Sequence, residues 1–234
     1  ARDMSNLKML RDKLIRSERL AATGQATASI VHEIKNPLSI IGGFARSIRK
    51  HPEDSERVVR NAAIIADETD RLETLVFELL DFSRPRPLQK ERSDLIGLLN
   101  GTLDLLRKEA YSRKVRIETD FPEQTLEADL DPNRMKQVFL NLTQNAMNAM
   151  PEGGTIRVSA AVEDCWTMVF FTDNGRGIPA DCQGRVFEPF FTTHGKGTGL
   201  GLAISHRIIE SHGGFITLAS EEGKGTTVQV RLPR

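Results

Sequence analysis

The sequence predicts an α+β fold in two parts. The first is a hairpin of two long helices that pairs with a second copy into an antiparallel dimeric four-helix bundle, and the second is a domain of helices packed on a mostly antiparallel sheet. Apolar residues recur at spacings of three and four over two long segments, which indicates the two helices. Beyond residue 92, helical segments are grouped with short strand-like segments, which is typical of an α+β layer.

The composition excludes several classes of partner. With 39% hydrophobic residues among 234, the chain can bury one or two cores. Lys and Arg (32) balance Asp and Glu (32), so net charge supports no nucleic-acid partner and no anionic membrane surface. No apolar run approaches the roughly 20 residues of a membrane span, and no secretory signal opens the chain. We therefore expect a cytoplasmic fragment without direct membrane contact. The full-length protein can still have a membrane anchor upstream of this fragment.

The N-terminal part is expected to be helical throughout. Residues 1–22 predict a coiled-coil lead-in, because leucines follow a loose heptad there. Residues 23–84 predict the helical hairpin, whose first helix ends at His51-Pro52. Pro37 lacks an N–H and is expected to kink that helix.

The second helix of the hairpin is expected to begin after Asp54 or Ser55, either of which can cap it. Its apolar seam is predicted at Val58, Ala62, Ile65, Thr69, Leu72, Val76 and Leu79. Two helices with narrow stripes cannot enclose a core alone, so we expect a homodimer.

A proline-rich break separates the two parts. The run SRPRP ends the second helix and predicts a linker over 85–91 that acts as a hinge, followed by the second domain over 92–234. In that domain the sequence predicts helices near 93–110, 132–150 and 201–212. It predicts strands near 115–120, 126–128, 155–162 and 167–172, with a final hairpin ending at 232. Cys165 and Cys182 form neither a disulfide framework nor a metal site by spacing.

The first chemically informative stretch is SIVHEIKNPL, with His32, Glu33 and Asn36. At about 100° per residue, His32 lies roughly 200° round the helix from Ile30 of the apolar stripe, so it is expected to point outward. Asn36 shares its face one turn away. An ordinary surface histidine on a kinked helix explains His32 alone, so the rest of the chain must decide.

Four downstream stretches suggest a nucleotide site. NLTQNAMNAM places Asn141, Asn145 and Asn148 on one helix, and a neutral amide oxygen can complete a Mg²⁺ shell without charge repulsion; a solvent-facing polar stripe is the alternative. In DNGRGI, Asp173 ends a strand as an acceptor that suits the exocyclic amine of adenine, although a simple turn fits as well.

The third stretch, GKGTGLGLAI, places three alternate glycines before a helix, where backbone N–H groups can cradle phosphate. The pattern is neither a P-loop nor a Rossmann fingerprint. Before it, Phe187, Phe190 and Phe191 can anchor a mobile lid or belong to the core. In the fourth stretch, EGKGTTVQVRLP, Thr226 offers a hydroxyl near the base or is an ordinary strand-edge threonine.

Taken together, these motifs resemble the catalytic core of two-component sensor histidine kinases over essentially the full chain. HEIKNPL resembles the H box of that family, NLTQNAMNAM the N box, FEPFF the F box, and DNGRGI, GKGTGLGL and GKGTT the G boxes. The stretch NAMNAMPEGG and the short lid are most similar to the nitrogen-regulator and AtoS-like branch. The resemblance implies a HisKA-type dimerisation and phosphotransfer bundle followed by a Bergerat-type α/β sandwich that binds ATP.

The resemblance also implies residue roles. His32 would be the phosphoacceptor and Glu33 its base, while Asn36 would orient the water that dephosphorylates the partner. Asn145 would bind Mg²⁺, and Arg185 would reach the γ-phosphate. The implied nucleotide contacts are Asn141, Asn145, Asn148, Asp173, Gly175, Gly177, Lys196, Gly197, Thr198, Gly199, Leu200, Gly201 and Thr226. Many members carry Lys or Arg in place of Asn148, which leaves more of the phosphate charge to Arg185 and Lys196.

The sequence therefore predicts an ATP-dependent protein-histidine kinase that autophosphorylates His32, relays the phosphoryl group to an aspartate of a response regulator receiver domain, and dephosphorylates that regulator. An ATPase of the gyrase, Hsp90 and MutL superfamily and a non-catalytic dimeric scaffold are the alternatives. The sequence leaves open the signal, the cognate regulator, cis or trans transfer and the balance of kinase and phosphatase.

Overall fold

The computed structural model describes residues 31, 33–83, 87–193 and 197–234. They form two compact units, which are described separately. The first contains the helical hairpin and the segment 192–200, and the second contains residues 86–191 and 201–234. The predicted lead-in over 1–22, His32 and Lys196 lie outside the described residues.

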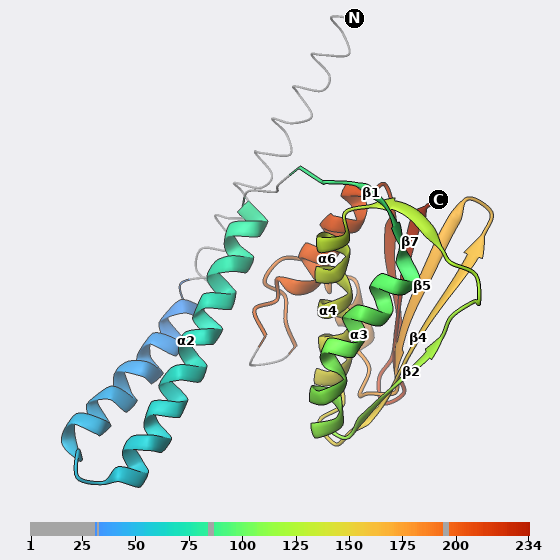
Figure 1. The fold of residues 1–234 in the computed structure, drawn as a ribbon. Coiled ribbons are helices and arrows are strands. Elements are labelled where there is room, and N and C mark those ends of the chain that lie inside the picture. The colour runs from blue at the N-terminus through green and yellow to red at the C-terminus, as the bar shows by residue number, and fades with distance from the viewer. Residues whose placement is uncertain (1–30, 32, 84–86, 194–196) are drawn as a thin grey trace, which may run out of the picture. The chain divides into compact units, whose positions relative to one another are not determined.

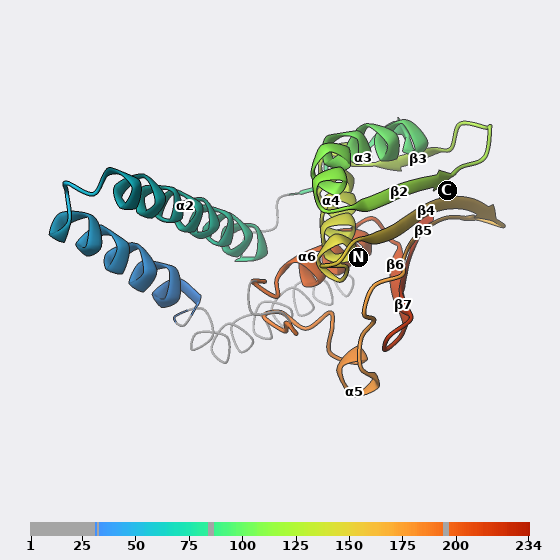
Figure 2. The same ribbon diagram turned by 90° about the horizontal axis from the view of Figure 1, so that it is seen from below.

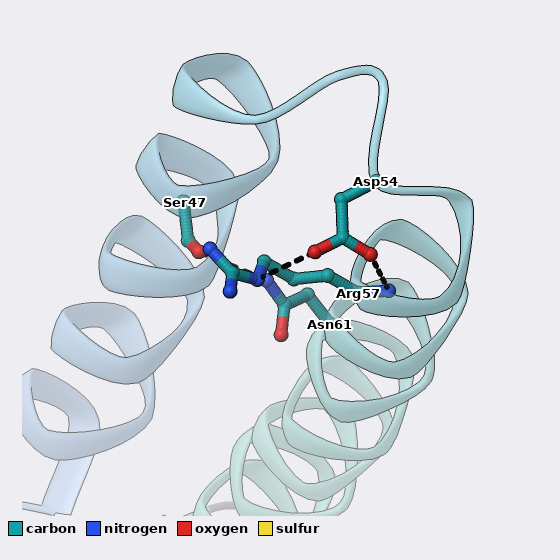
Figure 3. A network of polar contacts seen from close by, with 4 residues as sticks. All are labelled: Ser47, Asp54, Arg57 and Asn61. Atoms are coloured by element: carbon teal, nitrogen blue, oxygen red, sulfur yellow. Dashed lines mark hydrogen bonds and ion pairs between the residues drawn. The ribbon is translucent and has the colours of Figure 1, made fainter.

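The hairpin consists of a helix described over residues 33–50 and α2 (Ser55–Ser83), which run antiparallel to each other (Figure 1). The first helix ends directly before His51, as predicted. Asp54 caps α2, because its Oδ1 accepts a hydrogen bond from the backbone N–H of Arg57 at 3.0 Å. The Arg57 guanidinium returns to the same carboxylate, 3.2 Å from Oδ2 (Figure 3). The kink at Pro37 stays a prediction.

A polar pair occupies the buried face of α2. Asn61 is only 3% exposed, and its Nδ2 donates to Ser47 Oγ of the first helix at 3.1 Å (Figure 3). Leu75 is buried further along the same face. Ala62, Thr69 and Val76 of the predicted seam are exposed in the single described hairpin, and their packing against a second hairpin stays a prediction. The apolar pattern did not predict that Asn61 is buried, because its amide donates to a serine on the other helix.

Several large apolar side chains of the hairpin remain exposed. Val59 is 69% exposed and Phe77 61%, and Leu80 and Leu38 are also more than half exposed. These side chains leave exposed apolar surface on both helices of the hairpin.

The second unit is an α/β sandwich. Its elements are β1 (Glu91–Asp94), α3 (Leu95–Ser112), β2 (Val115–Asp120), β3 (Glu127–Leu130), α4 (Pro132–Asn148), β4 (Gly154–Glu163), β5 (Trp166–Asp173), α5 (Ala180–Gln183), α6 (Gly201–Ser211), β6 (Phe215–Glu221) and β7 (Gly225–Pro233). Strands β2-β4-β5-β7-β6 form the main sheet, in which only β2 and β4 are parallel. Helices α3, α4 and α6 form the second layer (Figure 2). The predicted α+β architecture is confirmed.

The helix layer is fixed to the sheet by apolar packing and by helix caps. Phe139 of α4 packs on Phe171 of β5, with ring centroids 5.9 Å apart. Asp131 caps α4 by accepting from the backbone N–H of Arg134 at 3.1 Å. The two elements that the sequence did not predict, β1 and α5, have four residues each, too few to show a periodic pattern. No helix in the described ranges is long and apolar enough to span a membrane.

A buried histidine ties three segments of this unit together. His212 is 2% exposed, its Nε2 accepts from the backbone N–H of Asp131 at 2.9 Å, and its Nδ1 lies 2.8 Å from the Ile208 carbonyl. The ring is therefore neutral, with its proton on Nδ1. The Asp131 carboxylate also accepts from the N–H of Gln89 at 2.9 Å. The start of α4, the end of α6 and the segment before β1 thus share one network.

We expect the stability of this unit to decline in mild acid. Burial lowers the pKa of His212, although its bond to the Ile208 carbonyl opposes the shift. The unfolded chain binds a proton near the ordinary histidine pKa of about 6.5, whereas the folded chain does not, so the free energy of unfolding falls as the pH drops below that value. Urea titrations between about pH 7.5 and about pH 5.5 should show this loss. His212→Gln, whose amide oxygen can still accept from Asp131, should show a smaller one. If the free energy of unfolding depends on pH equally in both proteins, the loss of stability in acid does not come from His212.

Candidate functional site

The first helix carries two of the predicted phosphotransfer residues within its described part. Asn36 is exposed, and Glu33 is half-buried. Burial raises the pKa of Glu33; the charge of Arg71 opposes this and the charge of Glu78 adds to it. A carboxylate with a raised pKa is a better proton acceptor near neutral pH than an ordinary one.

Asp173 is the last residue of β5, in the middle of the main sheet. It is 8% exposed, its Oδ1 accepts from the N–H of Gly175 at 2.9 Å, and Thr226 lies opposite it on β7. Burial raises the pKa of Asp173, while the backbone N–H groups of Gly175 and Thr226 oppose the shift. The structure thus holds a buried hydrogen-bond acceptor at the rim of the sheet.

The loop after Asp173 is fixed to the turn between β6 and β7. Gly177 has φ +68°, and a Cβ there would collide with the Glu221 carbonyl. The N–H of Gly223 donates to the Arg176 carbonyl at 2.7 Å. Gly225, with φ +116°, lies so close to the Asp173 carbonyl that no side chain fits. Glycine is required at both positions because two backbone segments approach each other there too closely for a side chain to fit.

The three asparagines of α4 differ in their contacts. The Nδ2 of Asn141 donates to the Gly201 carbonyl at 2.7 Å and lies 3.3 Å from Ser205 Oγ, so this amide holds the start of α6. The Oδ1 of Asn148 accepts from Arg113 Nη1 at 2.9 Å and joins α4 to the end of α3. Asn145 is exposed, and among the described residues its side chain has no hydrogen-bond partner. Its amide oxygen is therefore the one of the three that fits a Mg²⁺ ligand.

The predicted phosphate cradle extends from Gly197 to Gly201. Gly199 has φ +66°, Leu200 is fully buried and Gly201 begins α6. The Thr198 hydroxyl donates to Glu78 Oε2 of α2 at 2.6 Å, within the same compact unit, and accepts from the N–H of Leu200 at 3.3 Å.

Arg185 lies on the surface, where its guanidinium makes only weak contacts. Its Nε is 3.1 Å from Glu188 Oε2, and its guanidinium carbon lies 4.6 Å from the centre of the Phe191 ring. Exposed ion pairs and cation–π contacts are weak, so Arg185 can exchange them for a phosphate. Phe187 stacks near His206, and it, Phe190 and Phe191 are half-buried, which fits anchors at the base of a loop better than a core.

Two family models match the chain. Residues 22–87 match the His Kinase A phospho-acceptor domain, and residues 130–234 match the histidine kinase-, DNA gyrase B- and HSP90-like ATPase family. The chain is also 30% identical to the catalytic domain of the histidine kinase ThkA, covering 62% of this chain and 96% of that one with a TM-score of 0.58. The chain belongs to the sensor histidine kinase family.

Other histidine kinases match nearly the whole chain. Sensor histidine kinase ZraS of Escherichia coli K12 is 39% identical over 99% of this chain and 50% of its own length. The crystal structure of ThkA in complex with the response regulator TrrA superposes with a TM-score of 0.85 at 33% identity, covering 97% of this chain and 66% of that one. This histidine kinase chain thus spans about half the length of its curated relative ZraS.

Some site residues of this histidine kinase had no sequence signal. Gln183 Nε2 donates to the carbonyls of Ile178 and Ser220 at 2.9 Å each, and Ser220 Oγ accepts from the N–H of Ile178 at 2.8 Å. A glutamine in a four-residue helix and a serine in a strand carry no pattern that points to such roles. Only the three-dimensional approach of the two loops reveals them.

Proposed function

We propose that this chain is an ATP-dependent protein-histidine kinase that autophosphorylates His32 and relays the phosphoryl group to an aspartate of a response regulator. The observation that carries the proposal is Asp173, a buried acceptor at the end of β5, in a domain that follows a phospho-acceptor hairpin in the same chain. An acceptor there suits the amine of adenine and repels the carbonyl of guanine.

The residues of the hairpin supply the proton chemistry. A neutral imidazole attacks phosphorus through one nitrogen only while the other carries the proton. Glu33, beside His32 in the sequence and with its pKa raised by burial, accepts that proton as the N–P bond forms. Mg²⁺ held by Asn145 would supply charge neutralisation on the phosphates. The Arg185 guanidinium, freed from Glu188, would bind the γ-phosphate.

The exposed apolar residues of the hairpin support a homodimer. Val59, Phe77 and Leu80 of α2 and Leu38 of the first helix would be covered when two hairpins form a four-helix bundle. The ThkA structure, which contains a response regulator, supports a receiver domain as the second partner of this chain.

Incubation with γ-labelled ATP and Mg²⁺ tests the proposal. The chain should acquire a label that acid removes and alkali does not, because a phosphoramidate hydrolyses in acid. An acid-stable label would indicate a hydroxyl acceptor and would contradict the proposal.

The alternative of a plain ATPase is favoured by the family match of the second domain alone. It predicts steady release of phosphate without a labelled protein intermediate. The hairpin match argues against it, and unchanged hydrolysis after His32→Ala would revive it.

Asn36 is expected to act mainly in dephosphorylation. Asn36 is exposed and follows His32 by four positions in the sequence, so its amide would orient a water for attack on a phosphorylated regulator. We expect Asn36→Ala to slow dephosphorylation of the regulator at least about tenfold while autophosphorylation changes less than about twofold. Ser39→Ala, on the same helix and also exposed, is the matched control. Equal losses in both reactions would show that Asn36 is structural.

A further inference from the structure

Thr226 of the GKGTT motif pairs with Asp173 across the sheet, and its hydroxyl contacts Ser220, a residue absent from the motifs above. Ser220 of β6 has three polar neighbours: the N–H of Ile178 at 2.8 Å, the Gly225 carbonyl at 2.9 Å and Thr226 Oγ1 at 2.9 Å. Thr226 is 8% exposed and pairs with Asp173 across β5 and β7. Cross-strand partners project to the same face of a sheet, so the Thr226 hydroxyl and the Asp173 carboxylate share one site.

The chemistry of Ser220 fixes the direction of each bond. A serine hydroxyl has one proton to donate and two lone pairs to accept. The Ile178 N–H can only donate, and the Gly225 carbonyl can only accept, so the Ser220 proton goes to Gly225. Only one arrangement makes all three contacts hydrogen bonds at the same time. In it, the Thr226 hydroxyl donates its proton to the Ser220 oxygen.

This arrangement leaves Thr226 as an acceptor toward any ligand. Its only proton is directed at Ser220, so the oxygen presents lone pairs, as the Asp173 carboxylate does. Two adjacent acceptors suit an amine and oppose a carbonyl oxygen. A threonine hydroxyl that is free to rotate would instead donate to that carbonyl and tolerate it.

The position of Ser220 is itself firmly held. Gln183 Nε2 donates to both the Ile178 and Ser220 carbonyls at 2.9 Å, and the close approach at Gly177 leaves this loop no room to shift toward Glu221. The Ser220 and Thr226 hydroxyls therefore belong to a rigid junction of two loops.

We propose that Ser220 is a specificity-determining residue: by holding the Thr226 proton, it makes the base pocket acceptor-only and so excludes purines with a 6-carbonyl group. The inference rests on the proposed ATP site and adds to it a residue that acts on the base through Thr226.

Calorimetric titration with ATP and with inosine triphosphate tests this role. The second nucleotide replaces the 6-amine by a carbonyl and adds a proton on N1. Ser220→Ala should lower the ratio of the two dissociation constants about five- to tenfold, mainly through tighter binding of inosine triphosphate, because one hydrogen bond of ordinary strength is gained. Ser220→Thr, which keeps the hydroxyl, should retain the wild-type ratio.

Two further variants separate specificity from structure. Ser220→Cys has nearly the same volume but accepts hydrogen bonds weakly, so it should behave like Ser220→Ala even where the alanine variant folds poorly. In Ser220→Ala/Thr226→Val the rotating hydroxyl is gone, and the gain for inosine triphosphate should disappear. Variants that weaken both nucleotides equally, with an unchanged ratio, would overturn the role of Ser220 and leave the ATP site intact. A wild-type protein that binds neither nucleotide would overturn the proposed function itself.

Discussion

Asp173→Asn is expected to weaken ATP binding about a hundredfold, because it replaces a charged acceptor by an amide whose NH₂ group can face the adenine amine. The carboxylate already accepts the N–H groups of Gly175 and Thr226, so an amide cannot serve these donors and the base equally well. Burial magnifies the loss, since an unpaired polar group away from water keeps its full desolvation cost. Isothermal titration of the variant with ATP measures the effect directly.

The matched control is Asp120→Asn, an exposed aspartate at the end of β2, which should leave ATP affinity unchanged. The same physics gives a pH dependence. Because burial raises the pKa of Asp173, its protonation begins at a higher pH than that of an ordinary carboxyl, and ATP affinity should fall as the pH drops through that raised pKa. If Asp173→Asn binds ATP with wild-type affinity, Asp173 does not contact the base.

Glu33→Gln is expected to slow autophosphorylation about a hundred- to ten-thousandfold without weakening ATP binding. The glutamine keeps the shape of the side chain but cannot take the imidazole proton. In the wild type, burial raises the pKa of Glu33 and Arg71 only partly opposes it. The rate should therefore rise with pH until this raised pKa is passed, and that rise should be absent in the variant. Single-turnover labelling across a pH series measures both quantities.

Glu73→Gln is the control for that experiment, since Glu73 is an exposed carboxylate on α2 of the same unit. It should label at the wild-type rate. If Glu33→Gln lowers the rate only a fewfold and keeps the pH profile, Glu33 orients His32 and another group takes the proton.

Much of the fold followed from local rules. The cap at Asp54, the end of the first helix before His51 and the strand at Val115–Asp120 all depend on residues adjacent in sequence, and the structure has them where they were predicted. The burial of Asn61 on α2 did not follow from such rules, because its amide donates to Ser47, fourteen residues away on the other helix. An apolar periodicity depends on apolar residues alone, so it does not predict the burial of an asparagine whose amide is hydrogen-bonded.

The candidate site shows the same division. The position of Asp173 and the glycines after it could be predicted from the sequence, because a strand that ends near glycines is a local pattern. The separate contacts of Asn141, Asn145 and Asn148 are not, since they depend on partners such as Gly201 and Arg113 in other elements. Ser220 and His212 likewise owe their roles to contacts that only the assembled sheet and helix layer create.

The most direct test of the central claim is the location of the phosphoryl group after incubation with γ-labelled ATP and Mg²⁺. Wild-type protein and His51→Gln, which removes the histidine at the start of the hairpin loop, should carry the same acid-labile label. His32→Gln should carry none, and calorimetry should show that it still binds ATP. Equal labelling of His32→Gln would contradict the assignment of His32 as the phosphoacceptor.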